Sequence, residues 1–104
     1  MAYTTIDNPF KHFNTKTYTG TGSSNALTGV GFQPDWTWIK KRNSTGDHEL
    51  YDAVRGVTKT LYSNGTSAEY THSNGLTAFG TDGFTVGTGG SVNNSSDTFV
   101  AWNW

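Results

Sequence analysis

Two pairs of tryptophans are the residues of this sequence whose type and spacing most suggest binding chemistry. They are Trp36 with Trp38, and Trp102 with Trp104. One residue separates the members of each pair, so on a β-strand both rings lie on the same face. If the two strands share that face, the rings form cross-strand aromatic contacts. Three roles stay open: hydrophobic core, which is favoured, a protein–protein surface, and a platform for sugar rings.

A charged segment supplies the remaining binding candidates. Asp52 and Arg55 are close enough in sequence for a charge-assisted pair that pins a loop. A structural ion pair is favoured there, and recognition of an acidic ligand by Arg55 is the alternative. Asp47 lies next to His48 and Glu49. On a strand His48 points away from both neighbours, so these three residues do not predict a metal site.

The acidic and histidine residues form no catalytic pattern. A glycosidase needs two carboxylates at a defined separation, and scattered acids offer such a pair by chance. His12, His48 and His72 lack the spacing of metal ligands. We therefore expect no enzyme, no catalytic residue, no metal and no cofactor, with a small glycan-active enzyme as a remote alternative. Calcium at loops around Asp82 or residues 93–97 stays open.

Charge and cysteine content exclude several classes of protein. The formal net charge is -1, which gives no electrostatic case for nucleic acid or an anionic membrane. The absence of cysteine excludes disulfides and thiolate chemistry and suits assembly in a reducing compartment. Residues 1–7 lack a signal-peptide pattern, and no apolar run approaches the roughly 20 residues of a spanning helix. We expect neither membrane insertion nor Sec-type secretion.

The composition favours strands and turns, with aromatic rings as the main material of the core. Threonine favours strands, and the abundant glycine, asparagine and serine favour turns. Only 33% of the residues are hydrophobic, so most aromatic rings, the tryptophans included, are expected inside. Trp104, which ends the last strand, is the ring most expected to stay uncovered.

The alternation of residues predicts about eight short strands in one domain, residues 1–104. An antiparallel two-sheet sandwich or a jelly roll is therefore expected, with the first and last strands beside each other or beside a central strand. A helix over residues 47–55 competes with the strand predicted at 48–53. Residues 80–83, with Asp82–Gly83 supplying the positive φ, are expected to form a hairpin turn. Residues 87–96 are expected to form a polar, flexible loop. The predicted strands cover residues 16–19, 35–41, 48–53, 58–62, 67–71, 76–79, 84–86 and 98–104.

Several stretches resemble a known module. They comprise residues 31–40, 50–59, 82–87 and 99–104, with a further match at 18–22. In order and spacing they are similar to a β-sandwich module of tail-fibre and other virion proteins of tailed phages, especially phages of marine and cyanobacterial hosts. The similarity spans nearly the whole chain.

The resemblance implies a concanavalin-like or SPRY-like sandwich and a non-catalytic role on the virion surface. The chain would be a tail-fibre or receptor-binding component, or a protein that decorates the capsid or tail. Its expected partners are other virion proteins or further copies of itself, with a host-surface glycan as an additional candidate. It would be assembled in the host cytoplasm and reside in the virion. A carbohydrate-binding module that uses exposed tryptophans is the alternative function.

Overall fold

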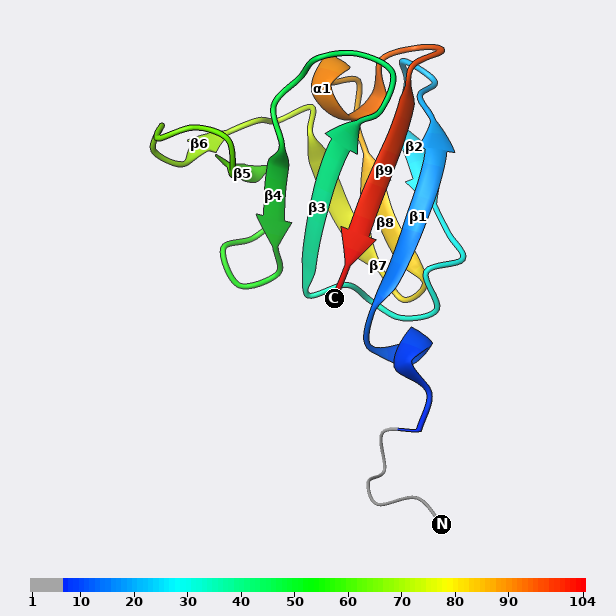
Figure 1. Cartoon of the computed structure of the whole chain (residues 1–104). Coiled ribbons are helices and arrows are strands. Elements are labelled where there is room, and N and C mark those ends of the chain that lie inside the picture. Colours follow the sequence, from blue (N-terminus) through cyan, green and yellow to red (C-terminus); the bar gives the residue numbers. More distant parts are fainter. Residues whose placement is uncertain (1–6) are drawn as a thin grey trace.

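The computed structural model describes residues 7–104, which form two antiparallel sheets (Figure 1). Residues 1–6, which belong to the N-terminal segment that lacks a signal-peptide pattern, lie outside the described residues. The large sheet has the spatial order β1 (Asn14–Thr19), β9 (Thr98–Asn103), β3 (Trp36–Lys41), β4 (Glu49–Asp52), β5 (Lys59–Tyr62) and β6 (Tyr70–Thr71). The small sheet has the order β2 (Asn25–Leu27), β8 (Gly83–Val86) and β7 (Leu76–Gly80). The predicted all-β fold of two antiparallel sheets is confirmed, and it is compatible with a small sandwich.

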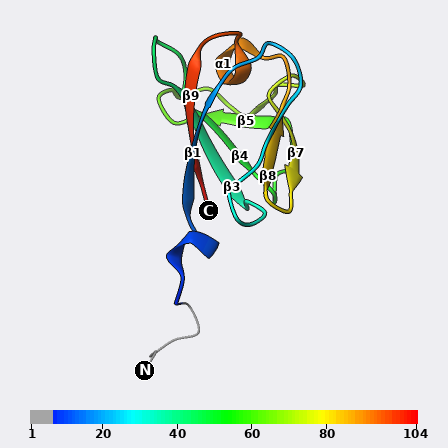
Figure 2. The ribbon, with the colours of Figure 1, turned by 90° about the vertical axis from the view of Figure 1, so that its right-hand side faces the viewer.

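The last strand, β9, lies inside the large sheet. It pairs with β1 on one side and with β3 on the other, and β3 pairs in turn with β4. The expected neighbourhood of the first and last strands is thereby confirmed, as is the internal position of the strand that begins at Trp36. The small sheet lies behind the large one in Figure 1, and the edge-on view of Figure 2 shows β7 and β8 on one side of β1, β9 and β3 only.

The core fills the space between the two sheets. Ile39 of β3, Tyr51 of β4 and Phe99 of β9 contribute large, fully buried side chains from the large sheet. Leu76 and Phe84 face them from the small sheet, in the same hydrophobic cluster. Each buried aromatic ring removes about 150–250 Å² from water, which makes these few rings the main source of stability.

The strand predicted over residues 48–53 is confirmed by β4, and the competing helix over residues 47–55 is wrong, because Glu49 and Tyr51 both point inward at strand spacing. Other local features differ from the prediction. The segment 87–96 is more than a loop, since it contains α1 (Gly90–Asn93), with Val92 and Asn93 buried. The strand β2 was not predicted, nor was η1 (Pro9–Lys11), a short 3-10 helix.

The predicted hairpin, with its turn at residues 80–83, is confirmed between β7 and β8. Gly80 pairs with Gly83, so Thr81 and Asp82 form the turn and Gly83 begins β8. A Cβ atom at Gly83 would lie 1.9 Å from the carbonyl oxygen of Leu27. Glycine is therefore required at this position by the close approach of β2, and no other residue would let the small sheet pair as it does. Within residues 7–104, no helix is both long and apolar enough to cross a membrane.

Candidate functional site

The tryptophans lie on the face of the large sheet that the small sheet does not cover. In β9 the buried residues are Phe99, Ala101 and Asn103, so Trp102 points outward. β3 alternates in the same way, with Thr37 and Ile39 buried and Trp36 and Trp38 pointing outward. The expectation that the tryptophans belong to the core is therefore wrong, since the core rings come from tyrosine and phenylalanine.

The outer tryptophans pack against one another in two cross-strand pairs. The rings of Trp36 and Trp104 stack with centroids 4.4 Å apart and planes at 22°. Phe13 tilts against Trp104 at 4.9 Å. Trp38 and Trp102 stand directly opposite each other in the register and make an edge contact at 5.4 Å. Trp36 and Trp104 stay 37% and 38% exposed, which confirms that Trp104 is uncovered.

Aliphatic side chains extend this surface across the sheet. Leu50 lies opposite Trp38, and Leu61 lies opposite Leu50, so all three share one face. Val100 occupies the same face of β9, two residues from Trp102. We use the term tryptophan face for the outward side chains of this set, which comprises Trp36, Trp38, Leu50, Leu61, Val100, Trp102 and Trp104. Every member is half-buried or exposed, so the face is apolar and open.

One indole N–H of the tryptophan face is already paired. Trp38 donates from Nε1 to Nδ1 of His48 over 3.0 Å. Because an indole N–H can only donate, Nδ1 of His48 must accept this hydrogen bond, and the proton of the imidazole ring resides on Nε2. A partner covering this part of the face therefore does not leave that indole N–H without an acceptor.

The predicted ion pair of Asp52 and Arg55 is present beside Trp36. Asp52 is the cross-strand neighbour of Trp36, and its carboxylate accepts from the backbone N–H of Arg55 at 2.7 Å and from Nε at 2.5 Å. Arg55 also donates to Glu69 at 3.0 Å and to the carbonyl of Leu50 at 3.1 Å. Burial opposes ionisation of Asp52, but the hydrogen bonds and charge of Arg55 hold its pKa below the ordinary value. The favoured structural role is confirmed.

Asp47 is the candidate that the structure separates from the others. It precedes β4, whereas Asp52 ends that strand. Its carboxylate accepts a hydrogen bond from the side-chain amide of Asn64 at 2.9 Å. The same amide group accepts from the backbone N–H of His48 at 3.0 Å. Asp47 thus helps to join two loops and contributes nothing to the tryptophan face.

A buried polar cluster was missed in the sequence. Glu49 is fully buried, and its two carboxylate oxygens accept from the hydroxyls of Tyr51 and Ser91. Nδ1 of His72 lies 3.2 Å from the same carboxylate. Burial and the charge of Glu49 raise the pKa of Tyr51. The alternation of side chains along β4 places Glu49 on the same inward face as Tyr51, so the burial of Glu49 could have been predicted from the sequence. Its partners His72 and Ser91 lie on distant segments, and no local pattern indicates them.

This cluster does not have the order of a catalytic triad. Glu49 lies between Ser91 and His72, whereas an activated serine needs the histidine as its direct partner.

The acidic side chain at the predicted loop around Asp82 also makes hydrogen bonds within the fold. Asp82 accepts from the backbone N–H groups of Gly29 and Gly31 at 3.0 and 2.7 Å, which lowers its pKa. Within residues 7–104, no group of three or more His, Cys, Asp or Glu could hold a metal.

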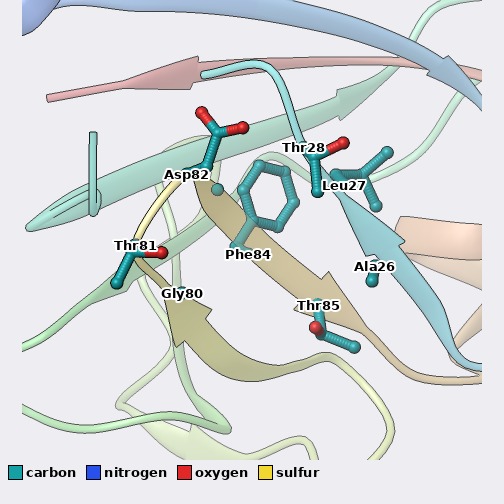
Figure 3. A pocket seen from close by; sticks show the side chains of 9 residues that line it. Ala26, Leu27, Thr28, Gly80, Thr81, Asp82, Phe84 and Thr85 are labelled. Carbon is teal, nitrogen blue, oxygen red and sulfur yellow. The ribbon is translucent and has the colours of Figure 1, made fainter. Parts of the chain in front are cut away.

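A small hollow lies on the small sheet, near the turn that joins β7 to β8 (Figure 3). Its volume is about 200 Å³, below the roughly 300–1,000 Å³ of ordinary ligand pockets. The ring of Phe84 and the side chains of Leu27 and Thr28 gather beside it (Figure 3). The lining residues are Ala26, Leu27, Thr28, Gly80, Thr81, Asp82, Gly83, Phe84 and Thr85. The tryptophan face is the larger candidate surface.

Comparison with known proteins places the chain in a family without assigning it an activity. No curated protein and no solved structure matches the chain. A family described as a domain of unknown function (DUF7483) matches residues 8–104, which is nearly the entire chain. The chain therefore belongs to the DUF7483 family.

Proposed function

We propose that this chain is a non-catalytic module on the surface of a phage virion, and that it binds a protein partner through the tryptophan face. It would serve as a tail-fibre or receptor-binding component, or as a decoration protein of capsid or tail. The observation that carries the proposal is the position of the tryptophans. They lie on the open side of the large sheet, where the core does not need them.

The composition of this face supports a protein partner. Monomeric proteins rarely leave large contiguous apolar surfaces open, and such surfaces mark interaction sites. Tryptophan is among the residues most enriched where interfaces concentrate their binding energy. Leu50, Leu61 and Val100 surround the rings with further apolar area. An apolar sheet face of this kind suits packing against another sheet.

The acidic side chains support a non-catalytic role. A general acid or base must reach its substrate with a free carboxyl group. Glu49 is buried, the carboxylate of Asp52 is bonded to Arg55, and Asp97 pairs with Lys41 at 2.8 Å. Each of these groups thus joins segments of the fold.

Contacts among the rings support a protein partner over a glycan. A sugar stacks on an open ring face, yet Trp104 stacks on Trp36 at 4.4 Å and has Phe13 tilted against it at 4.9 Å. These contacts take up ring surface that a sugar would need, which favours a protein partner. One arrangement does suit a sugar, because Trp36 borders the polar Asp52. Isothermal titration with soluble glycans, comparing Trp36→Ala with Val54→Ala, tests this second candidate; heat that only Trp36→Ala abolishes would support it.

Mass spectrometry of phage particles tests the virion assignment. Particles would be purified on a density gradient from the host culture in which the chain is expressed. We expect the chain to co-migrate with intact particles in many copies per virion, as closed symmetry requires. If it stays in the soluble fraction and is absent from particles, the virion role is wrong.

A further inference from the structure

We infer that His48 makes the tryptophan face sensitive to pH. Neutral His48 holds Trp38 within the face, whereas protonated His48 releases the indole and brings a positive charge to the face. The two residues come from neighbouring segments of the large sheet, because Trp38 belongs to β3 and His48 immediately precedes β4. The switch is a property of the isolated chain, and only its effect on a partner rests on the proposed function.

The hydrogen bond between the two rings exists in one protonation state of His48 only. Trp38 donates from Nε1 to Nδ1 of His48 over 3.0 Å. An indole nitrogen cannot accept, and a protonated imidazole carries an N–H group on each nitrogen. Protonation of Nδ1 therefore sets two donors against each other, and turning the ring does not restore an acceptor. The bond is present while His48 is neutral and is lost as the pH falls through the titration of this ring.

The charged groups around His48 are bound to other partners. Lys40 of β3 is the cross-strand neighbour of His48 when the register of β3 and β4 is continued by one residue, and its ammonium donates to two backbone carbonyls near the end of β3. The carboxylate of Asp47 accepts from Asn64, which is uncharged, and Glu49 points into the core. None of the ion pairs among residues 7–104 includes His48. A positive charge on this ring therefore has no carboxylate partner in that part of the chain.

Protonation of His48 changes the middle of the tryptophan face. Trp38 stands opposite both Trp102 and Leu50 in the sheet, and its edge contact with Trp102 spans 5.4 Å between centroids. Without its acceptor, the indole N–H of Trp38 must turn to water, and the ring loses the bond that orients it. A protein partner that covers the face would also bury the half-buried, protonated His48, and burying an unpaired charge is strongly disfavoured. Because one proton is linked to binding, we expect affinity to fall by up to about tenfold per pH unit in acid.

Nitrogen-15 NMR of the isolated chain, titrated from about pH 8 to about pH 5, where histidine ordinarily changes charge, tests the switch. At the alkaline end, Nδ1 of His48 should be unprotonated and Nε2 protonated. The indole N–H resonance that is missing in Trp38→Phe should shift with the same midpoint as the His48 ring. His48→Asn is the matched variant, because its amide oxygen can accept without titrating, and the Trp38 resonance should then stay constant. His12→Gln, a change at the end of η1, should leave the wild-type shift unaltered.

Three NMR results would overturn the inference. They are a proton on Nδ1 of neutral His48, a Trp38 resonance that stays constant while His48 titrates, and a Trp38 shift that persists in His48→Asn. The first two need no variant, so they decide the question even if His48→Asn fails to fold.

Washing gradient-purified phage particles at about pH 8 and about pH 5 tests the effect on a partner. Particles should lose more of the wild-type chain in acid, whereas the loss of the His48→Asn chain should not depend on pH. Equal acid release of both chains refutes the regulation of binding by His48. Particles that lack the chain refute the virion role, and the NMR titration still decides the switch.

Discussion

Removing the buried carboxylate of Glu49 should destabilise this chain more than any change at an exposed acid. Glu49→Ala leaves the hydroxyls of Tyr51 and Ser91 and the ring nitrogen of His72 without their acceptor. An orphaned buried donor costs about 1–3 kcal/mol. Tyr51 is fully buried, whereas Ser91 and His72 are partly exposed and can turn to water. With one donor left buried and unpaired, we therefore expect a loss of about 1–3 kcal/mol from the free energy of unfolding.

That loss is large against a total stability of about 5–15 kcal/mol. The matched control is Glu69→Ala, which removes the other glutamate of the chain from an exposed ion pair with Arg55. Exposed pairs contribute about 0.2–1 kcal/mol. Urea unfolding followed by circular dichroism, with both variants at one dilute concentration, measures the two losses. A loss below about 1 kcal/mol for Glu49→Ala, or equal losses for the two variants, would refute the assignment of Glu49 as the acceptor that joins these segments.

Three further predictions follow from the core, the ion pair and the close contacts. Phe99→Ala should cost about 3–5 kcal/mol in urea unfolding, because it empties a fully buried site stacked on Tyr18; a loss under 1 kcal/mol would contradict this packing. Asp52→Asn should cost about 0.2–1 kcal/mol at pH 7. Because the folded-state pKa of Asp52 lies below its ordinary value, this difference should vanish in unfolding curves as the pH falls through the folded-state pKa; a difference that persists in acid would show another cause. Gly75→Ala should lower the melting temperature, because its Cβ would lie 2.2 Å from the hydroxyl of Tyr51; unchanged melting would contradict the packing of Gly75 against Tyr51.

The strand positions of β3 and β9 could be predicted, but the side facing the core could not. Residue alternation places Trp102 and Trp104 together and opposite to Phe99 and Ala101. Both sets are apolar, so period-2 spacing alone gives no reason to bury one of them. The gap of about 10 Å between sheets must be filled at close packing by side chains from both sides. In the structure this gap is filled by Phe99 and Ala101, which have smaller side chains than the two tryptophans. Which set is buried therefore depends on the space that the small sheet leaves.

The elements that were missed depend on contacts between distant segments. β2 comprises only Asn25–Leu27, and it becomes a strand because β8 pairs with it. Helix α1 has a glycine-rich sequence that does not favour helix, and it is fixed by Asn93. The side-chain amide of Asn93 donates to the carbonyls of Ser23 and Gly87 at 2.6 and 2.8 Å. No local pattern encodes these partners, whereas the local pair of Asp52 with Arg55 was predictable.

Quenching of tryptophan fluorescence tests most directly whether these rings form an open face. Acrylamide would be titrated into the isolated, folded chain at low concentration. We predict efficient quenching, because Trp36 and Trp104 are each more than a third exposed. Rings that resist quenching, with the blue-shifted emission of buried indole, would contradict an outward tryptophan face.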